Sequence, residues 1–257
     1  MKTQLLGGVL LLATAASAQE AISVPAATMP SPGVFIPRVV TQLIGYEDPT
    51  TGESKTHGVQ NASLDAGIAA DWSVMLKFET SLQFDDRKSQ HDPHVMFKHR
   101  FYRKDLGIIS TERMAVYGGV EIDEDLDPFL GLVYTKIDGR WGTNLGISWE
   151  TGEVADDGPP ILAGHAGADL WKLQSSVLYR LFPEDYSTTS DHAWYATIET
   201  SVPYEKNGDW EWTLGPGILY EGRRQAFEAN LRIPVQQNIN HRAETEWALA
   251  IGWRTLF

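Results

Sequence analysis

Charged side chains recur at alternate positions within apolar segments, and they are the first residues in this chain whose spacing suggests chemistry. Lys77 and Glu79, for example, alternate with Leu76 and Phe78. Residues two apart on a β-strand point to one face, so such a strand has a charged face and an apolar face. Facing rows of opposite charge orient and select polar molecules between them, whereas charges that pair fill and stabilise an interior. The residues that we expect to form this polar, lumen-type lining are Arg38, Lys77, Glu79, Arg100, Arg232, Glu244, Glu246 and Arg254.

Two other clusters contain residue types that bind metal ions. The acidic loop 121–127 has carboxylates suited to Ca²⁺ or Mg²⁺, but it lacks the glycine and the spacing of a calcium-binding loop, which favours a solvated, self-repelling loop. His91, His94 and His99 lie close in sequence, yet His94 and His99 fall on opposite faces of a strand. A metal site needs at least three converging ligands. We expect neither a metal site nor a cofactor.

Ser190, Asp191 and His192 are the residues that would support a hydrolase. Lipid-hydrolysing sites need a serine, a histidine and an orienting acid or amide that converge in space. These three residues are adjacent in sequence, and neighbouring strand residues point to opposite faces, so we expect them not to form a relay. The sequence therefore predicts no enzymatic activity and no catalytic residues.

The elements that position the charged residues are strands. Alternation with a period of two recurs from Val34 to the end of the chain and predicts an all-β fold. The connections are at first alternately long and short, which favours an antiparallel transmembrane β-barrel over a soluble β-sandwich. We expect about 12 strands, with roughly 10 to 14 compatible with the length. The predicted strands are 34–46, 58–68, 73–84, 94–102, 108–120, 128–137, 140–150, 163–182, 192–204, 209–220, 224–236 and 242–257.

The final segment has the clearest two-faced pattern. Its alternate residues from Ala243 through Trp247 to Phe257 are apolar or hydroxylated, and the residues between them are charged or small. One face suits lipid and the other a wet lumen. A terminal aromatic residue on such a strand is the usual signal that directs a barrel to be inserted into the bacterial outer membrane. We therefore expect Trp253 and Phe257 to form the membrane-insertion signal.

The N-terminal region predicts export across the inner membrane. Lys2 precedes a short apolar core and the small residues Ala16-Ser17-Ala18, a pattern typical of a signal peptide cleaved after Ala18. The core is too short to span roughly 30 Å of hydrocarbon. The expected organisation is a signal peptide at 1–18, an exposed periplasmic N-terminal arm at 19–33 and an outer-membrane barrel at 34–257.

Composition narrows the class of protein further. The 257 residues include no cysteine and carry a formal net charge of −13. The lack of cysteine excludes disulfides and thiolate metal sites, and the excess of acid argues against nucleic acid as a partner. The nine Trp, nine Tyr and nine Phe suit the aromatic girdles of a transmembrane barrel.

Segments spread over most of the chain resemble an outer-membrane family named for the meta-pathway of phenol degradation. The strongest of them is Ile233-Pro234-Val235, which is followed by a polar turn and a final strand that ends in Phe. The resemblance implies an outer-membrane barrel for passive movement of small, aromatic or hydrophobic solutes. The segments are Pro32–Arg38, Gly67–Trp72, Asp92–Phe101, Pro128–Tyr134, Gly215–Tyr220 and Leu231–Asn240.

These observations together predict a porin-like channel or transporter of a Gram-negative outer membrane that passes small solutes passively. The expected partners are outer-membrane lipids and lipopolysaccharide, the barrel-assembly machinery during insertion, and the solute itself, but no nucleic acid. The alternative is a non-conducting barrel that acts as a structural scaffold or anchor. An open lumen distinguishes the first from the second, which needs a plugged lumen.

Overall fold

A computed structural model describes residues 20–49, 51–82, 91–107, 110–122, 126–152, 160–163, 169–185 and 190–257. The predicted signal peptide and residues 123–125 of the acidic loop lie outside these ranges. No helix within the described ranges is both long enough and apolar enough to cross a membrane.

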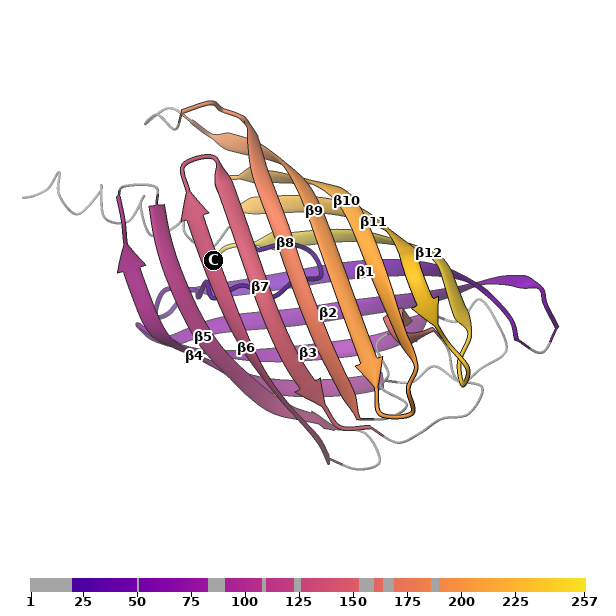
Figure 1. Ribbon diagram of the computed structural model, residues 1–257. Coiled ribbons are helices and arrows are strands. Elements are labelled where there is room, and N and C mark those ends of the chain that lie inside the picture. Colours follow the sequence, from indigo (N-terminus) through magenta and orange to yellow (C-terminus); the bar gives the residue numbers. More distant parts are fainter. Residues whose placement is uncertain are drawn as a thin grey trace, which may run out of the picture.

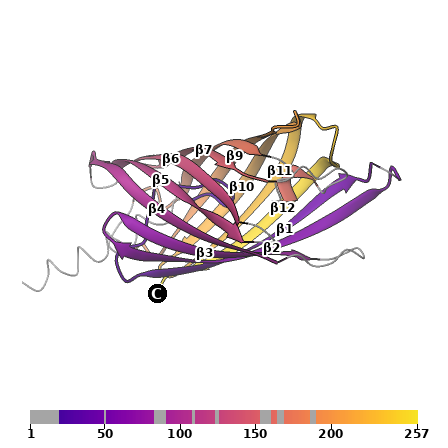
Figure 2. The same cartoon turned by 90° about the horizontal axis from the view of Figure 1, so that it is seen from below.

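Twelve strands in the described ranges form a closed antiparallel barrel (Figure 1). Each strand pairs with its neighbours in sequence, and β1 pairs with both β2 and β12, as the view from below shows (Figure 2). The predicted fold and strand number are thus confirmed. The strands are β1 Phe35–Glu47, β2 Ser54–Ala69, β3 Trp72–Leu82, β4 His91–Asp105, β5 Ser110–Ile122, β6 Leu126–Asp138, β7 Trp141–Glu150, β8 Leu170–Phe182, β9 His192–Glu205, β10 Trp210–Gly222, β11 Gln225–Asn238 and β12 Glu244–Thr255.

The first and last strands meet at the seam that closes the barrel. Arg38 of β1 lies opposite Arg254 of β12. Beyond β12, the main-chain N–H of Phe257 donates to the Phe35 carbonyl at 3.0 Å, and the N–H of Phe35 donates back at 3.2 Å. This pairing leaves no open edge at the seam over these residues, as a strand in lipid requires.

The two faces of the strands differ as the alternation predicted. On β3, Leu76 and Phe78 are exposed on the outer face, while Glu79 is buried. On β11, Phe227 and Leu231 are exposed outside, and Glu228, Asn230 and Arg232 are buried inside. An apolar exterior and a polar interior are the arrangement that lipid imposes on a transmembrane barrel.

A β-bulge changes the faces at the start of β12. Gly45 pairs with Trp247, but the next residue, Tyr46, pairs with Thr245, so Glu246 is the extra residue. The absence of a side chain at Gly45 is required, because a Cβ there would lie 2.2 Å from the Trp247 indole. Beyond the bulge Thr245 is buried, whereas Glu244 and Glu246 are exposed. The prediction that these two glutamates line the lumen is therefore wrong, because a bulge reverses the alternation.

The eighth strand begins later than predicted, at Leu170 instead of 163. Residues Ile161–Ala163 form a 3₁₀ turn, η1, so Ala163, the first residue of the predicted strand, belongs to this turn. Leu162 packs against the buried cluster of Ile44, Val59 and Ala248 inside the barrel. Leu162 is thus packed inside the barrel without being part of a strand. Alternation with a period of two does not by itself tell such a turn from a strand.

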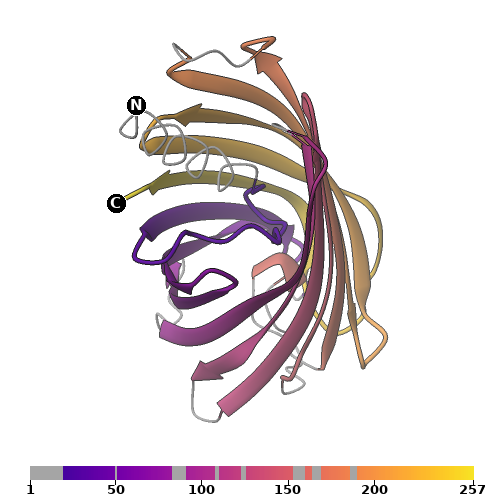
Figure 3. The same ribbon diagram turned by 90° about the vertical axis from the view of Figure 1, so that its left-hand side faces the viewer.

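The N-terminal segment, residues 20–33, lies inside the barrel and is named here the lumen segment. Figure 3 shows it in indigo within the ring of strands. Ala21, Val24, Ala26 and Ala27 are at most 2% exposed, so the prediction of an exposed arm is wrong. The physical reason is that its side chains are small enough to fit the lumen, while its main-chain groups find polar partners there.

Candidate functional site

Acidic and basic side chains line the part of the lumen formed by β9 to β12 and β1. The Arg38 Nη2 lies 2.7 Å from Glu228 Oε1 on β11. Arg242, just before β12, pairs with Glu205 of β9 at 2.7 Å, and both of these side chains are almost completely buried. Glu211 of β10 is also buried. This wall therefore presents both signs of charge along its length.

The lumen surface formed by β5 to β8 has an uncharged row between charged residues: Arg113 and Arg180 are buried on these strands, and Lys172 pairs with Glu150 at 3.6 Å. Thr135 Oγ1 donates to Asn144 Oδ1 at 2.7 Å, and Asn144 Nδ2 donates to Ser176 Oγ at 3.0 Å. Beside this hydrogen-bonded row, Tyr117 and Val133 are buried in a cluster with Ala27 and Met29 of the lumen segment. Charged residues thus occur on both sides of the lumen, and the side formed by β5 to β8 also carries this uncharged row.

The lumen segment is held through its main chain. Both carboxylate oxygens of Glu199 accept hydrogen bonds, from the N–H of Ile22 at 3.3 Å and of Ser23 at 3.0 Å. Arg38 Nη2 donates to the carbonyls of Ala21 and Ile22 at 3.2 and 3.1 Å. These bonds use the same kinds of charged lumen residues that were expected to meet a solute.

Other side chains, nearer the uncharged row, also bind the main chain of the lumen segment. Lys98 Nζ donates to the Ala26 carbonyl at 3.3 Å, and the next N–H, that of Ala27, donates to Thr135 Oγ1 at 2.8 Å. Gln174 Nε2 donates to the Ser23 carbonyl at 2.9 Å. Strands from around the barrel therefore contact one short stretch of chain.

Glu20 is the charged residue of the lumen segment. Burial by itself raises the pKa of its carboxyl, but Lys98, Arg38 and Arg254 outweigh this effect and hold the pKa below its usual value. Arg254 Nη1 also donates to the Glu20 carbonyl at 3.3 Å. Glu20 is thus ionised and neutralises part of the positive charge around it.

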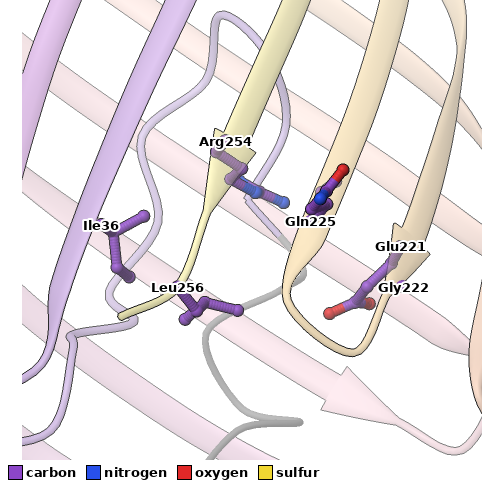
Figure 4. A pocket seen from close by; sticks show the side chains of 7 residues that line it. Ile36, Glu221, Gly222, Gln225, Arg254 and Leu256 are labelled. Atoms are coloured by element: carbon purple, nitrogen blue, oxygen red, sulfur yellow. The ribbon is translucent and has the colours of Figure 1, made fainter.

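A small pocket lies at the end of the lumen beside the C-terminus (Figure 4). Arg254 from β12 lines it together with Gln225 from β11 and Glu221 from β10, and Ile36 and Leu256 supply apolar walls. Arg254 also donates to the Glu20 carbonyl, so this residue contacts both the pocket and the lumen segment.

The structure does not bring the residues predicted to line the lumen to one place. Arg38 and Arg254 lie beside the lumen segment, whereas Lys77 Nζ pairs with Glu79 at 2.6 Å on β3. Arg100 binds the β2–β3 turn, with Nη2 2.7 Å from both Asp71 Oδ1 and the Ala70 carbonyl. Arg232 of β11 is buried, whereas Glu244 and Glu246 are exposed.

Sequence reasoning missed Glu199, Glu205 and Glu211 as lumen residues. All three are buried and lie on the inner face of β9 and β10. The alternation could have identified them: Glu199, for example, lies between Ile198 and Thr200, which point outward. The role of Glu199 in binding the lumen segment was not predictable, since it depends on contacts across more than half the chain.

The other predicted clusters form no metal site among the described residues. His94 Nδ1 lies 3.7 Å from Glu121 Oε2 on the next strand, and the His99 ring stacks on Trp72 with centroids 4.2 Å apart. Asp191 pairs with Arg223, while the His192 ring lies 5.5 Å from that of Phe182.

Asp209 joins two loops at the end of the barrel opposite the C-terminus. Its carboxylate accepts the main-chain N–H groups of Asn240 and His241, each at 2.9 Å, and the His241 Nδ1 lies 3.0 Å away. Burial alone raises the pKa of Asp209, but these hydrogen bonds from His241 and Asn240 prevail and hold the pKa below its usual value. The junction therefore favours the ionised carboxylate.

Replacing this carboxylate is expected to destabilise the barrel. Asp209→Asn should lower the free energy of unfolding by about 2 kcal/mol at neutral pH, since charge-assisted hydrogen bonds are lost. The pKa of Asp209 is lower in the folded protein than in the unfolded chain, where it is about 4, so its ionised carboxylate stabilises the fold above about pH 4. This stabilisation is lost as the pH falls through the pKa of the folded protein. Urea unfolding of both proteins on either side of that window measures the difference, which should shrink in acid. A difference that does not depend on pH would contradict this assignment.

Comparison with known proteins supports the architecture. No family model and no curated protein matches the chain. An outer-membrane channel from Pseudomonas putida F1 has a similar structure, with a TM-score of 0.58 and 12% identity over 93% of this chain and 99% of that one. The NanC porin gives a TM-score of 0.47 at 11% identity, over 85% of this chain and 98% of that one.

The closed barrel, its apolar exterior and this structural likeness define the class: the protein has the fold of an outer-membrane β-barrel. Within that class its structural neighbours include channels and porins. The finer family expected from the sequence, that of the phenol meta-pathway, stays a prediction.

Proposed function

We propose that this protein is an outer-membrane channel for passive passage of small solutes and that the described state is closed by its own lumen segment. The observation that carries the proposal is the polar interior of a barrel with an apolar exterior. Arg38, Glu199, Glu228 and Arg254 form a row of both charges that borders the lumen. A barrel of this size is intermediate between small barrels that side chains fill and porins with open aqueous channels.

The arrangement favours polar solutes. Burying an unpaired charge is costly, so a lumen of this kind accepts molecules that satisfy its acids and bases. The resemblance found in the sequence adds small aromatic solutes to the classes to be screened. The lumen segment is bound by hydrogen bonds from separate side chains, and each such bond is individually weak, so its release does not require unfolding of the barrel.

Single-channel recording of the refolded protein in a planar bilayer tests the proposal. We expect discrete conductance steps that grow with salt concentration and alternate with long closed periods, because the lumen segment occupies the path. A folded barrel that shows no conductance, even when the lumen segment is removed, would overturn the proposal and favour a structural scaffold. Folding is checked by the altered electrophoretic mobility of unheated barrels.

A further inference from the structure

The lumen binds a peptide main chain at both its donors and its acceptors. Glu199 and Thr135 accept N–H groups of the lumen segment, while Arg38, Gln174, Lys98 and Arg254 donate to its carbonyls. The groups come from β9, β6, β1, β8, β4 and β12, so the binding surface surrounds the chain. Each contact is made to atoms that every peptide possesses.

The side chains of the lumen segment contribute mainly by being small. Ala26 and Ala27 are completely buried, and Ala27 contacts Ala115, Tyr117 and Val133 in one apolar cluster. The ring of Pro25 lies over Gly146, where an added Cβ would be 3.4 Å from the Pro25 Cγ. The site therefore selects residues by size and not by a particular functional group.

Glu199 and Thr135 both accept main-chain hydrogen bonds from the lumen segment, and Glu199 accepts more of them than Thr135 does. It is 2% exposed and binds two successive N–H groups, one to each carboxylate oxygen, together with the Ser23 hydroxyl. A buried carboxylate without such donors would carry an unmet desolvation cost. When the lumen segment leaves, Glu199 needs equivalent donors, and an incoming peptide bent as residues 22–24 are supplies them in the same spacing.

We propose that the lumen is a binding site for short peptides with small side chains and a bent main chain, and that the lumen segment is its tethered occupant. This inference rests on the proposed function, since it names the class of solute that the channel would pass. The free peptide replaces the main-chain hydrogen bonds of residues 20–27 one for one. Binding of a free peptide and retention of the lumen segment are therefore mutually exclusive.

The test uses a chain that begins at Val34 and a peptide of residues 20–28 with acetylated and amidated ends. A control peptide carries N-methyl groups at the amides of Ile22 and Ser23, which removes the two donors to Glu199. Binding is measured by calorimetry on the folded barrel, and block of the current is measured in a bilayer. If the shortened chain does not fold, the full chain with Ala27→Trp replaces it, because the buried site of Ala27 has no room for an indole.

We expect the unmodified peptide to bind and N-methylation to weaken binding roughly tenfold or more, as for the loss of hydrogen bonds to a charged group. Glu199→Gln should weaken binding to a similar extent. Glu211→Gln is the matched control, because Glu211 is a buried lumen glutamate outside the contacts of the lumen segment, and it should leave binding unchanged. Equal binding of the two peptides, or no binding to a folded barrel, would overturn the inference.

The two proposals fail in different ways. A barrel that conducts but binds neither peptide refutes the peptide site and leaves the channel intact. A barrel that binds the unmodified peptide selectively but never conducts supports the peptide site and refutes the channel.

Discussion

A chain that begins at Val34 is expected to conduct several-fold more current per open channel than the chain that keeps residues 20–33. The lumen segment fills the interior with buried residues such as Val24 and Ala26. The strands do not need it, because each is hydrogen-bonded to its neighbours around the closed barrel. Removing it replaces packed chain by water beside Arg38 and Glu199, and water-filled space carries ions.

Planar-bilayer recording of the two chains in the same salt measures this difference. A full chain with Glu199→Gln is an intermediate case, because it weakens the hold on Ile22 and Ser23 without shortening the chain. It should show more frequent openings of the larger size. Equal conductance and equal open time in all three proteins would mean that residues 20–33 do not block the path.

Breaking the Arg242–Glu205 pair is expected to have the largest effect on stability. The Nη2–Oε1 distance is 2.7 Å, and the two side chains are 1% and 0% exposed. Removing one partner of a buried pair leaves an uncompensated charge and typically costs about 3–5 kcal/mol. Arg242→Met or Glu205→Leu alone should therefore lower the free energy of unfolding by about this amount.

The double variant Arg242→Met with Glu205→Leu is the informative companion, because it leaves no unpaired charge. It should be more stable than either single variant, since hydrophobic replacement of a whole buried pair is often neutral. Lys206→Met is the control in the adjacent loop: its pair with Asp169 is 3.3 Å long, and the lysine is 76% exposed. That change should cost less than about 1 kcal/mol. Urea unfolding followed by tryptophan fluorescence compares all four variants.

The fold was predictable because a strand that crosses lipid needs an apolar outer face and can have a polar inner face. Segments such as β3 and β11 alternate strictly, so their number, faces and order followed from the sequence. The prediction was wrong where local geometry departs from a regular strand. At Glu246 a bulge shifts the faces, and β8 begins at Leu170 while Ala163 lies in a 3₁₀ turn.

The candidate site was predictable only in part. Alternation placed Arg38, Arg232 and Arg254 on the inner face, but it could not indicate which charges would meet across the lumen. The position of the lumen segment was the largest error. Its Pro- and Ala-rich composition resembles that of an exposed linker, and nothing local shows that Glu199, far along the chain, would bind its main chain.

The separation in sequence between the lumen segment and its partners has a consequence for the order of assembly. Ile22 and Glu199 are 177 positions apart, and a contact of such span pays its loop-closure entropy only late in folding. The first residues after the predicted cleavage site can thus dock only once β9 and the β1–β12 seam are in place. Before that step the strands would already be closed against lipid, but the lumen would not yet contain the lumen segment. Insertion of this segment would therefore be the last step of folding.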